Sequence, residues 1–286
     1  MSHLLILGTQ GQVGRALVAS ASANGVPYRA FSRTQCDITQ PLAVERALEG
    51  ARVVVNCAAY TAVDRAESDM EAAYAVNAIG PENVAAACAK LGIPMIHLST
   101  DYVFDGQQAR PWVEDDQPNP LSVYGRSKLA GELAIRARLE KHIILRTSWV
   151  FSADGENFVK AMLRLSRNSS QLRIVDDQVG APTAADDIAA AIVQVVTATN
   201  KYGFRAWGTY HFGGTPTVSW YEFARAILDG HRAAITPIAT KDSPRPARRP
   251  MNSALDCSRI LQVFGIRQPD WRPALAKVRD ELTARA

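Results

Sequence analysis

The sequence predicts an α/β fold: a doubly wound, Rossmann-like parallel sheet with a smaller C-terminal α/β substrate domain. Short apolar runs alternate with longer helical patterns through the first half of the 286 residues, which is typical of βαβ units and a parallel sheet. A glycine-rich turn also joins the first apolar run to the first helical pattern. Right-handed crossovers between such strands place helices on both faces of one sheet.

The first half predicts five strands separated by helices. The strands are the apolar runs HLLIL, YRAF, RVVVN, PMIHLS and HIILR, at residues 3–7, 28–31, 52–56, 94–99 and 142–146. The helical patterns between them cover residues 12–24 and 41–50, one long helix near 69–91, and a helix that begins near Ser122.

Beyond Thr147 the alternation is looser. Helices are predicted near residues 157–167, 184–197 and 219–228, with two more at the C-terminus, and strands at LRIV and TYHF. We therefore predict an NADP-binding domain over residues 1–147 and a mainly substrate-binding domain over residues 148–286. Segments of the second part are expected to cross back to the first sheet.

Composition narrows the class of protein. A hydrophobic fraction of 47%, 21% charged residues and a net charge of +4 are ordinary for a soluble enzyme. The chain shows no basic stripe for nucleic acid and no basic helix for a membrane surface, so we expect a small-molecule partner. Four cysteines without CxxC spacing indicate a reducing compartment. No basic leader or long apolar run is visible, which favours a cytoplasmic location.

The segment LLILGTQGQVGRAL places Gly8, Gly11 and Gly14 directly after a strand and at the start of a helix. There the first glycine permits a tight turn, the second lets a backbone approach a pyrophosphate, and the third allows close helix packing. Free N–H groups at a helix start bind an anion. The spacing is GxxGxxG and not GxGxxG, and a structural turn is the alternative, but the position favours nucleotide binding.

The second strand ends in AFSRTQCDI, which offers Ser32 and Arg33 where NAD-preferring sites usually offer a carboxylate. Hydroxyl and guanidinium donors suit a 2′-phosphate, so we predict NADPH as the cofactor and leave acceptance of NADH open. An arginine that simply faces solvent is the alternative. Asp37 and Ile38 lie where contacts to adenine are expected.

Small or polar residues follow the third and fourth strands. Ala58 and Ala59 come after the third, where small side chains admit a cofactor or allow close packing. Thr100, Asp101 and Tyr102 come after the fourth, at the same edge of the sheet, where ligands bind in open α/β folds. A hydroxyl there can bind a substrate carbonyl, and the alternative is an ST-turn that caps the strand end.

The segment SVYGRSKLAGE places Tyr124 and Lys128 four residues apart on one helix face. A cation beside a phenol favours phenolate and lowers the phenol pKa, although such a pair also occurs on solvated helices. Together with Thr100 at the same crevice, the pair predicts protonation of an alkoxide as hydride reaches a carbonyl carbon. Thr100 would hold the carbonyl oxygen, and Lys128 would also bind the nicotinamide ribose.

The chain resembles the extended short-chain dehydrogenase/reductase family, and within it the reductases of nucleotide-linked 4-keto sugars. The resemblance covers nearly the whole chain and rests on motifs in a characteristic order: GTQGQVG, NCAAYTAVDRAES, LSTDYVFDG, PNPLSVYGRSKLAGE, LRTSWVF, NFVKAMLRL, DDQVGAPT and RRPMNSALD. It implies NADPH-dependent reduction of the 4-keto group of dTDP-4-dehydro-6-deoxy-L-mannose to dTDP-L-rhamnose.

The resemblance also implies roles for residues of this sequence. Thr100, Tyr124 and Lys128 would be the catalytic set. Tyr102, Trp149 and Arg249 would contact the sugar nucleotide. Gln12, Val13, Ala58, Ala59 and Tyr60 would line the cofactor. Without the resemblance, Trp149 packing on a deoxysugar and Trp149 filling the core between domains are equally good interpretations.

Two neighbouring subfamilies fit the residues less well. Sugar-nucleotide dehydratases place an acidic pair directly after the threonine, whereas Thr100 is followed by Asp101 and then Tyr102. Epimerases keep NAD tightly bound, which the strand end at Arg33 makes less natural.

In SPRPARRP, residues 243–250, guanidinium groups could bind the substrate diphosphate, with a solvated linker as the alternative.

The resemblance gives less support for a bound metal ion and for a dimer. Some members of the family bind magnesium at a dimer contact through acids of the first helix and of the segment after GAPT. Here Arg15 and Ala16 stand where the first acid would lie, although Asp186 and Asp187 remain. We assign no metal ligand, magnesium is doubtful, and a homodimer through another surface stays open.

Two alternatives to this function remain. A non-catalytic NADP-binding regulatory subunit, resembling the beta subunit of methionine adenosyltransferase, would keep the fold and the cofactor. A reductase or epimerase of another nucleotide-linked keto sugar would keep the chemistry as well, because fold alone does not select a substrate. The presence of Thr100, Tyr124 and Lys128 favours an enzyme, since a purely binding role does not require them.

Overall fold

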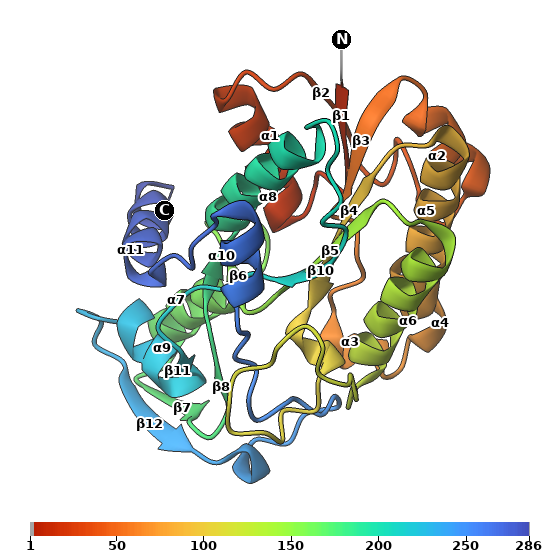
Figure 1. Cartoon of the computed structure of the whole chain (residues 1–286). Helices are drawn as coiled ribbons and strands as arrows, with labels where there is room; N and C mark the ends of the chain where they lie inside the picture. The colour runs from red at the N-terminus through yellow and green to blue at the C-terminus, as the bar shows by residue number, and fades with distance from the viewer. Residues whose placement is uncertain (1–2, 286) are drawn as a thin grey trace.

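The computed structural model describes residues 3–285, and its centre is a six-stranded parallel sheet (Figure 1). The strand order is β10-β5-β4-β3-β1-β2. The strands are β1 (His3–Leu7), β2 (Tyr28–Phe31), β3 (Ala51–Asn56), β4 (Met95–Thr100), β5 (His142–Thr147) and β10 (Gly208–His211). The chain order reverses at β1, which lies between β2 and β3. The doubly wound sheet predicted from the alternating pattern is therefore confirmed.

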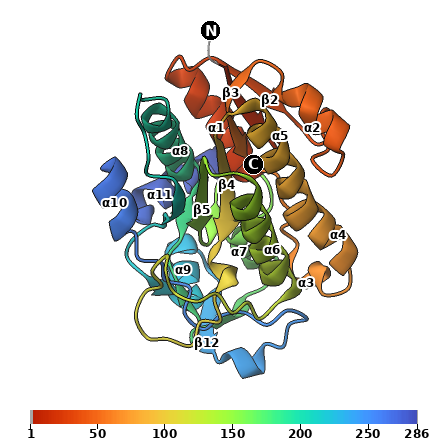
Figure 2. The ribbon, with the colours of Figure 1, turned by 45° about the vertical axis from the view of Figure 1, so that its right-hand side comes forward.

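Helices cover both faces of this sheet (Figure 2). One face carries α1 (Gln12–Ala23), α8 (Ala185–Thr199) and α10 (Ser258–Phe264). The other carries α2 (Pro41–Leu48), α5 (Gly80–Leu91) and α6 (Val123–Arg138). The strands are apolar on both sides because both of their faces are buried, as expected for a parallel sheet between two helical layers.

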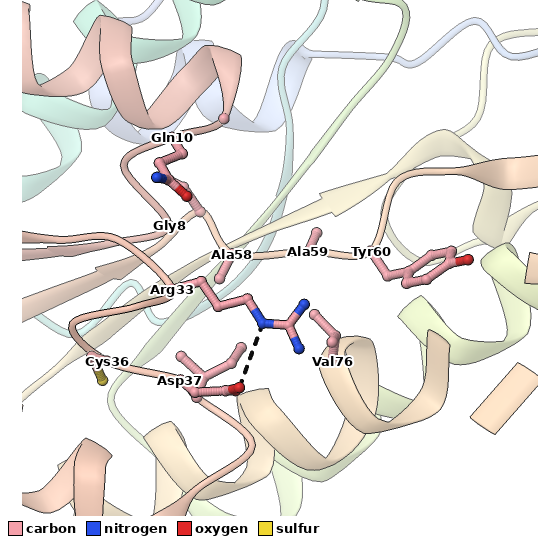
Figure 3. A pocket seen from close by; sticks show the side chains of 12 residues that line it. Gly8, Gln10, Arg33, Cys36, Asp37, Ala58, Ala59, Tyr60 and Val76 are labelled. Atoms are coloured by element: carbon pink, nitrogen blue, oxygen red, sulfur yellow. Dashed lines mark hydrogen bonds and ion pairs between the residues drawn. The ribbon is translucent and has the colours of Figure 1, made fainter. Parts of the chain in front are cut away.

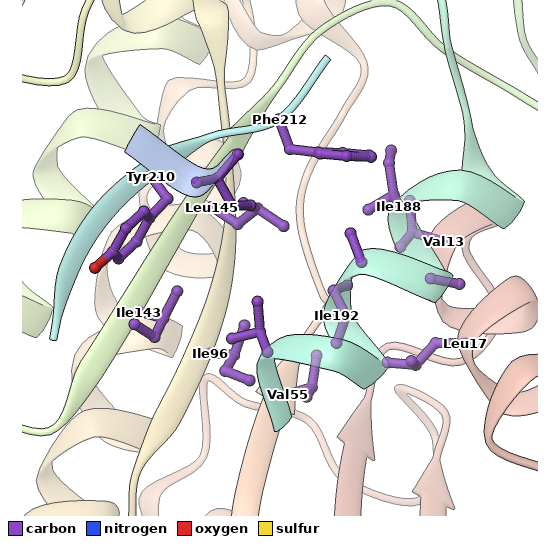
Figure 4. Packing of buried hydrophobic residues seen from close by; sticks show 14 of the residues in the cluster. Val13, Leu17, Val55, Ile96, Ile143, Leu145, Ile188, Ile192, Tyr210 and Phe212 are labelled. Atoms are coloured by element: carbon purple, nitrogen blue, oxygen red, sulfur yellow. The ribbon is translucent and has the colours of Figure 1, made fainter. Parts of the chain in front are cut away.

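The larger core lies between the sheet and the α1/α8 layer (Figure 4). Leu17 of α1 and Ile188 and Ile192 of α8 are completely buried against Val55 and Ile96 of the sheet. This packing fixes the first turn of α1, and so positions the glycine loop that precedes it at the carboxyl edge of the sheet.

The long helix predicted near residues 69–91 is interrupted. It consists of α4 (Met70–Tyr74), a π-helical segment η1 (Ala75–Ile79) and α5, preceded by the short α3 (Val63–Ala66). A π segment inserts one residue into the helical ladder and is frequent at functional sites. Buried Asn77 lies in η1, and its side chain bonds both backbone groups of Tyr60. The predicted long helix is thus confirmed over residues 70–91. The π segment within it goes with this tertiary contact, which local propensity does not predict.

The second lobe is built around a separate core. It contains β6 (Val150–Phe151), α7 (Phe158–Asn168), β7 (Gln171–Val175), β8 (Val179–Gly180), β9 (Thr183–Ala184), β11 (Val218–Ser219), α9 (Trp220–Ile227), β12 (Ala234–Ile238) and α11 (Trp271–Ala284). Three two-stranded sheets, β12-β7, β11-β8 and β6-β9, replace a large sheet here. Short 3₁₀ turns η2 (Asp101–Val103) and η3 (Thr240–Asp242) lie in the connections.

The chain crosses back to the first sheet after residue 147. Strand β10 pairs in parallel with β5, and α8 packs against α1. Segments of the second part thus return to the first sheet, as expected for chains of this kind, while the functional division at residue 147 stays a prediction.

Two further findings bear on the class of protein. All four cysteines are free thiols. Within residues 3–285, none of the helices combines the length and the apolar character that a membrane span requires.

Candidate active site

The glycine loop lies at the point where the strand order reverses, and its glycines are required by close backbone contacts. Gly8 has φ +81°, and a Cβ on it would lie 2.4 Å from the backbone nitrogen of Ala58. A Cβ on Gly14 would lie 2.3 Å from the carbonyl oxygen of Gly8. Gly11 is the N-cap of α1, and no side chain caps that helix start. The loop thus presents helix N–H groups beside the crevice, where an anion binds well.

A cavity of about 210 Å³ opens at this edge between β1, β2 and β3 (Figure 3). It is lined by eight residues predicted for the cofactor, Gly8, Gly11, Arg33, Asp37, Ile38, Ala58, Ala59 and Tyr60, and also by Gln10, Cys36, Cys57 and Val76. The Arg33 side chain extends across it and pairs with Asp37 at 3.4 Å. Arg33 is three-quarters exposed, so its guanidinium can turn to a ligand.

Six residues predicted for the cofactor lie outside this lining: Tyr124 and Lys128, which lie on α6, and four residues of the glycine loop, α1 and the end of β2. Val13 and Gly14 are buried under the loop. Ser32 bonds Gln35 and Thr34. The Gln12 amide oxygen accepts hydrogen bonds from Ser152 and Asn157 of the second lobe, each at 2.9 Å. Gln12 therefore joins the two lobes in this structure, and a cofactor contact by these six residues stays a prediction.

Thr100 and Tyr124 meet at the end of β4. Helix α6 begins after Ser122, whose hydroxyl accepts from the backbone N–H of Gly125 and so fixes the first turn that carries Tyr124. Burial raises the pKa of the Tyr124 phenol to about 12, and a hydrogen bond with Thr100 opposes that rise. The Thr100 hydroxyl also donates to Asp101 at 3.0 Å and accepts from the N–H of Tyr102 at 3.1 Å.

Lys128 lies one turn further along α6 and is almost completely buried. Its Nζ donates to the carbonyl of Leu98 at 2.7 Å and lies 3.2 Å from Nε2 of His97. Burial lowers the pKa of Lys128 to about 8. The sequence argument expected the Lys128 cation to lower the phenol pKa of Tyr124. That expectation was wrong for this structure, because desolvation dominates and raises the phenol pKa.

Asp101 is buried directly behind Thr100. Desolvation raises the pKa of its carboxyl to about 6, and among the described residues Oδ2 of Asp101 is one of two buried side-chain atoms without a hydrogen-bond partner. The carboxyl accepts from the Thr100 hydroxyl at 3.0 Å, and a hydrogen bond with Ser253 also opposes the rise in its pKa. In this structure Asp101 therefore orients Thr100, while the predicted contact with substrate remains open.

Two aromatic pairs involve residues predicted for the substrate. The ring of Tyr102 lies edge-on to that of Tyr124, with centroids 5.7 Å apart. Trp149, which adopts φ 47°, stacks on Trp220 with centroids 3.4 Å apart and an interplanar angle of 7°. A Cβ on Gly180 would lie 2.4 Å from the Trp149 ring. The chain thus holds Trp149 between Gly180 and Trp220, in the second lobe.

A second cavity of about 560 Å³ lies beside Tyr102 and Trp220. Arg245, Arg248 and Arg249 line it from the C-terminal segment. Arg249 pairs with Asp64 of α3 at 2.9 Å and bonds Tyr102. A cavity with three guanidinium groups suits a diphosphate.

Sequence reasoning missed three residues that position the site. Trp220 gave no signal beyond a capping pattern at Ser219. Asn77 interrupts an apolar helix, and its amide also donates to Ser127 of α6 at 3.0 Å. His97 is a lone polar residue in an apolar strand, and such residues are more often structural. A search for buried polar residues within otherwise apolar elements would have found the last two.

Two of the residues considered for magnesium have other partners. Asp186 pairs with Lys277 at 2.8 Å, and the guanidinium of Arg15 bonds the carbonyl of Gln10. Over residues 3–285, no cluster of three or more histidine, cysteine, aspartate or glutamate side chains has the geometry to hold a metal ion.

The fold and this edge define a class of protein. The chain combines a doubly wound parallel sheet, a glycine turn at its switch point, a threonine at the end of β4, and a tyrosine and a lysine one turn apart on α6. These are features of the extended short-chain dehydrogenase/reductases.

Within that class, the chain belongs to the dTDP-4-dehydrorhamnose reductase family. The family model described as "RmlD substrate binding domain" matches residues 1–284. The dTDP-4-dehydrorhamnose reductase of Sinorhizobium fredii is 41% identical over 287 residues, with 96% of each chain covered. That of Aggregatibacter actinomycetemcomitans is 42% identical over 295 residues, covering 98% of this chain and 99% of the relative.

Solved structures agree. A dTDP-4-dehydrorhamnose reductase from Clostridium acetobutylicum superposes with a TM-score of 0.92 at 38% identity, covering 98% of this chain and 99% of that one. The enzyme from Bacillus anthracis, solved in complex with NADP, superposes with a TM-score of 0.91 at 33% identity, covering 98% and 100%. The family resemblance seen in the sequence motifs is thus confirmed, and the protein is an oxidoreductase of this family.

Proposed function

We propose that the protein reduces the 4-keto group of dTDP-4-dehydro-6-deoxy-L-mannose to give dTDP-L-rhamnose, with NADPH as the reductant and Tyr124 as the proton donor. The names of the relatives support the reaction, and the NADP complex of the Bacillus anthracis enzyme supports the cofactor. The individual roles of the residues below are our inference from the geometry of the site.

One observation carries the proposal: each cavity is lined by a residue that neighbours Tyr124 or Lys128. Cys57 lines the glycine-loop cavity and lies close to Lys128. Tyr102 lines the arginine cavity and packs against Tyr124. A dinucleotide in the first cavity and a nucleotide sugar in the second would therefore have their reactive ends at Tyr124 and Lys128.

The chemistry follows from the protonation states of the group. NADPH, when bound, supplies the hydride. A phenol pKa raised to about 12 keeps Tyr124 protonated at neutral pH, so that it can give a proton to the oxygen at C4 as negative charge develops there. The Thr100 hydroxyl holds the same oxygen. Lys128 has an N–H left for a ribose hydroxyl after its bond to Leu98.

The second cavity supplies substrate binding. Arg245 and Arg248 are exposed and line it, so their guanidinium groups can close on a diphosphate. Arg249 is held by Asp64 and orients the segment. Trp220 lines this cavity with Trp149 stacked against it, and an indole face there suits the methyl side of a 6-deoxysugar. A direct contact of Trp149 with the sugar stays a prediction.

The preference for NADPH is assigned to Arg33, which lines the first cavity beside Asp37. Arg33→Ala should weaken NADPH binding by about tenfold or more and change NADH binding little, because only NADPH carries the 2′-phosphate. Titration by nucleotide fluorescence measures both. Arg46→Ala, which removes an exposed charge from α2, serves as the matched control. Equal losses for the two nucleotides would remove Arg33 as the reader of the phosphate.

The proposed function is tested by a coupled assay. The 4-keto-6-deoxy-L-mannose nucleotide is generated in situ, NADPH consumption is followed with the purified protein, and the product is identified by mass and sugar NMR. We expect NADPH oxidation that depends on the keto sugar and yields dTDP-L-rhamnose. Tight NADPH binding without reduction of this sugar or its nucleotide analogues would instead favour the regulatory-subunit alternative.

A further inference from the structure

Three buried side chains form a hydrogen-bonded row behind the active site. Asn56 and His97 are directly opposite each other on β3 and β4, and Lys128 reaches them from α6. Asn56 Nδ2 lies 3.1 Å from His97 Nδ1, and His97 Nε2 lies 3.2 Å from Lys128 Nζ. The first two residues are completely buried and Lys128 is 1% exposed, so solvent does not share these bonds.

The orientation of the Asn56 amide is fixed by the backbone. Its Oδ1 accepts from the N–H of Ala58 at 3.0 Å, at the start of the loop that lines the glycine-loop cavity. Its Nδ2 therefore faces His97. Because an amide nitrogen can only donate, Nδ1 of His97 must be the acceptor and carries no proton.

The tautomer of His97 decides whether Lys128 can be an ammonium or a neutral amine. With Nδ1 unprotonated, the neutral imidazole carries its proton on Nε2, and that N–H is directed at Lys128 Nζ. An ammonium has three donors and no lone pair, whereas a neutral amine has one lone pair and two N–H groups. Only the amine can accept from His97 while it donates to the carbonyl of Leu98.

We propose that Asn56 and His97 are positioning residues for Lys128, which present an N–H to its nitrogen and thereby stabilise its uncharged amine form relative to the ammonium in the cofactor-free protein. When Lys128 gains a proton, the lone pair is lost. The imidazole must then move its proton to Nδ1 and give up its bond from Asn56. The charge of Lys128 and the tautomer of His97 are thus coupled.

The groups around Lys128 leave it without a free counter-ion. Glu132 lies one turn along α6, but its carboxylate accepts two hydrogen bonds from buried Arg146, at 2.9 and 2.7 Å. Cys57 faces Lys128 from the end of β3, and burial raises the pKa of its thiol to about 12, so it is uncharged. Tyr124 on α6 is likewise protonated. Burial lowers the pKa of Lys128 to about 8 and that of His97 well below its ordinary value.

The consequence for catalysis rests on the proposed function. The reduction consumes one proton for each hydride, and Tyr124 delivers it. An ammonium held at a pKa near 8 is a much stronger acid than a phenol with a pKa near 12, so Lys128, once charged from solvent, favours a protonated Tyr124 before the next turnover. His97 would set the pH at which Lys128 takes up that charge.

The tautomer is measured directly by ¹⁵N NMR of cofactor-free protein labelled at histidine. His97→Gln assigns the signal among the five histidines. Above pH 8 we expect His97 to carry its proton on Nε2. His211 is a built-in control of the opposite kind, because its Nδ1 faces the carbonyl of Trp112 at 3.0 Å and must be protonated. A His97 ring with its proton on Nδ1 above pH 8 would overturn the proposal.

A substitution tests the coupling. Asn56→Asp replaces the donor to His97 by an acceptor, so the ring should turn to the Nδ1–H tautomer and its Nε2 should accept from a Lys128 ammonium. We expect the pKa of Lys128, measured by ¹³C NMR of labelled lysine and assigned with Lys128→Met, to rise by about one pH unit or more. In the His97→Leu background the same substitution should raise that pKa much less.

An equal rise in both backgrounds would mean that the new charge acts through space and that His97 is not the route. If Asn56→Asp fails to fold, the tautomer in the wild-type protein still decides the matter. These measurements need no substrate. A protein that reduces no keto sugar yet shows the Nε2–H tautomer would contradict the proposed function and leave this inference standing.

Discussion

At the residue scale, burial acts on Tyr124 and Lys128 in opposite directions. Desolvation penalises the charged form of each group, so the phenol pKa rises and the amine pKa falls. The sequence predicted that these two residues belong together, because spacing along a helix is a local property. It did not predict their pKa directions, since these depend on Leu98, His97 and the strands packed over α6, which are distant in the chain.

Tyr124→Phe tests the proton donor. The ring keeps its packing against Tyr102, and only the hydroxyl is lost. We expect kcat to fall by about 10³-fold, the size typical of a lost general acid, while NADPH affinity is unchanged. Steady-state assays and nucleotide titration measure the two. Tyr202→Phe, at a fully exposed side chain, is the control. Turnover retained within tenfold would remove Tyr124 from this role.

Asp101→Asn should stabilise the protein at neutral pH. A carboxyl pKa raised from 3.8 in the unfolded chain to about 6 in the folded one means that the folded state binds more protons between these values. Stability is therefore lost as pH rises through this window, and the cost above pH 6 is ~3 kcal/mol. Asparagine removes the charge but keeps an oxygen for Thr100.

Urea unfolding of the wild type and Asp101→Asn at pH 7 and pH 4 measures this effect. The free energy of unfolding of Asp101→Asn should exceed that of the wild type by about 2 kcal/mol more at pH 7 than at pH 4. A stability difference that is the same at both pH values would mean that the Asp101 carboxyl is not desolvated in the folded protein.

At the element scale, strands and caps were predictable where the signal is local. Apolar runs predicted β1, β2 and β5. A capping serine, Ser122, predicted the start of α6, and the glycine spacing predicted the turn at Gly8. The π segment at Ala75–Ile79 and the stack of Trp149 on Trp220 were not predictable, because they arise from contacts between segments far apart in sequence.

Gly8→Ala tests the turn between β1 and α1. A Cβ there would meet the backbone of Ala58 at 2.4 Å in a left-handed conformation, so β3 and its loop would have to move. We expect NADPH binding to be lost and the unfolding midpoint to fall. Gly25→Ala is matched for positive φ, at +63°, but meets nothing within 4 Å. It should cost only about 1 kcal/mol and leave binding intact. Similar binding losses in both variants would show that strain alone, and not the clash, matters.

At the scale of the whole molecule, the sheet is completed by residues far along the chain. Strand β10 covers the β5 edge, and α8 buries Leu17 and its neighbours on α1. From the sequence, segments were expected to return, because chains of this kind often contribute late strands to the first sheet. Which edge they cover was not predictable, since strand pairing is non-local.

A fragment of residues 1–147 should therefore not fold cooperatively. It lacks α8 and β10, so one core would face water and β5 would become an open edge. We expect a broad urea transition and binding of a hydrophobic dye. Addition of residues 148–286 as a separate chain should restore part of the transition. A sharp transition with full NADPH affinity for the fragment alone would show that the first part is an independent domain.

The most direct test of the account is to trace the hydride. The purified protein is incubated with the keto-sugar nucleotide and NADPH carrying deuterium at the transferable position of C4 of nicotinamide, and the sugar product is analysed by NMR. The proposed chemistry predicts one deuterium on C4 of the deoxysugar in dTDP-L-rhamnose, with the hydroxyl proton drawn from water. Deuterium on another carbon, or oxidation of NADPH without a labelled sugar, would contradict the proposal that this edge of the sheet is a 4-keto-sugar reductase site.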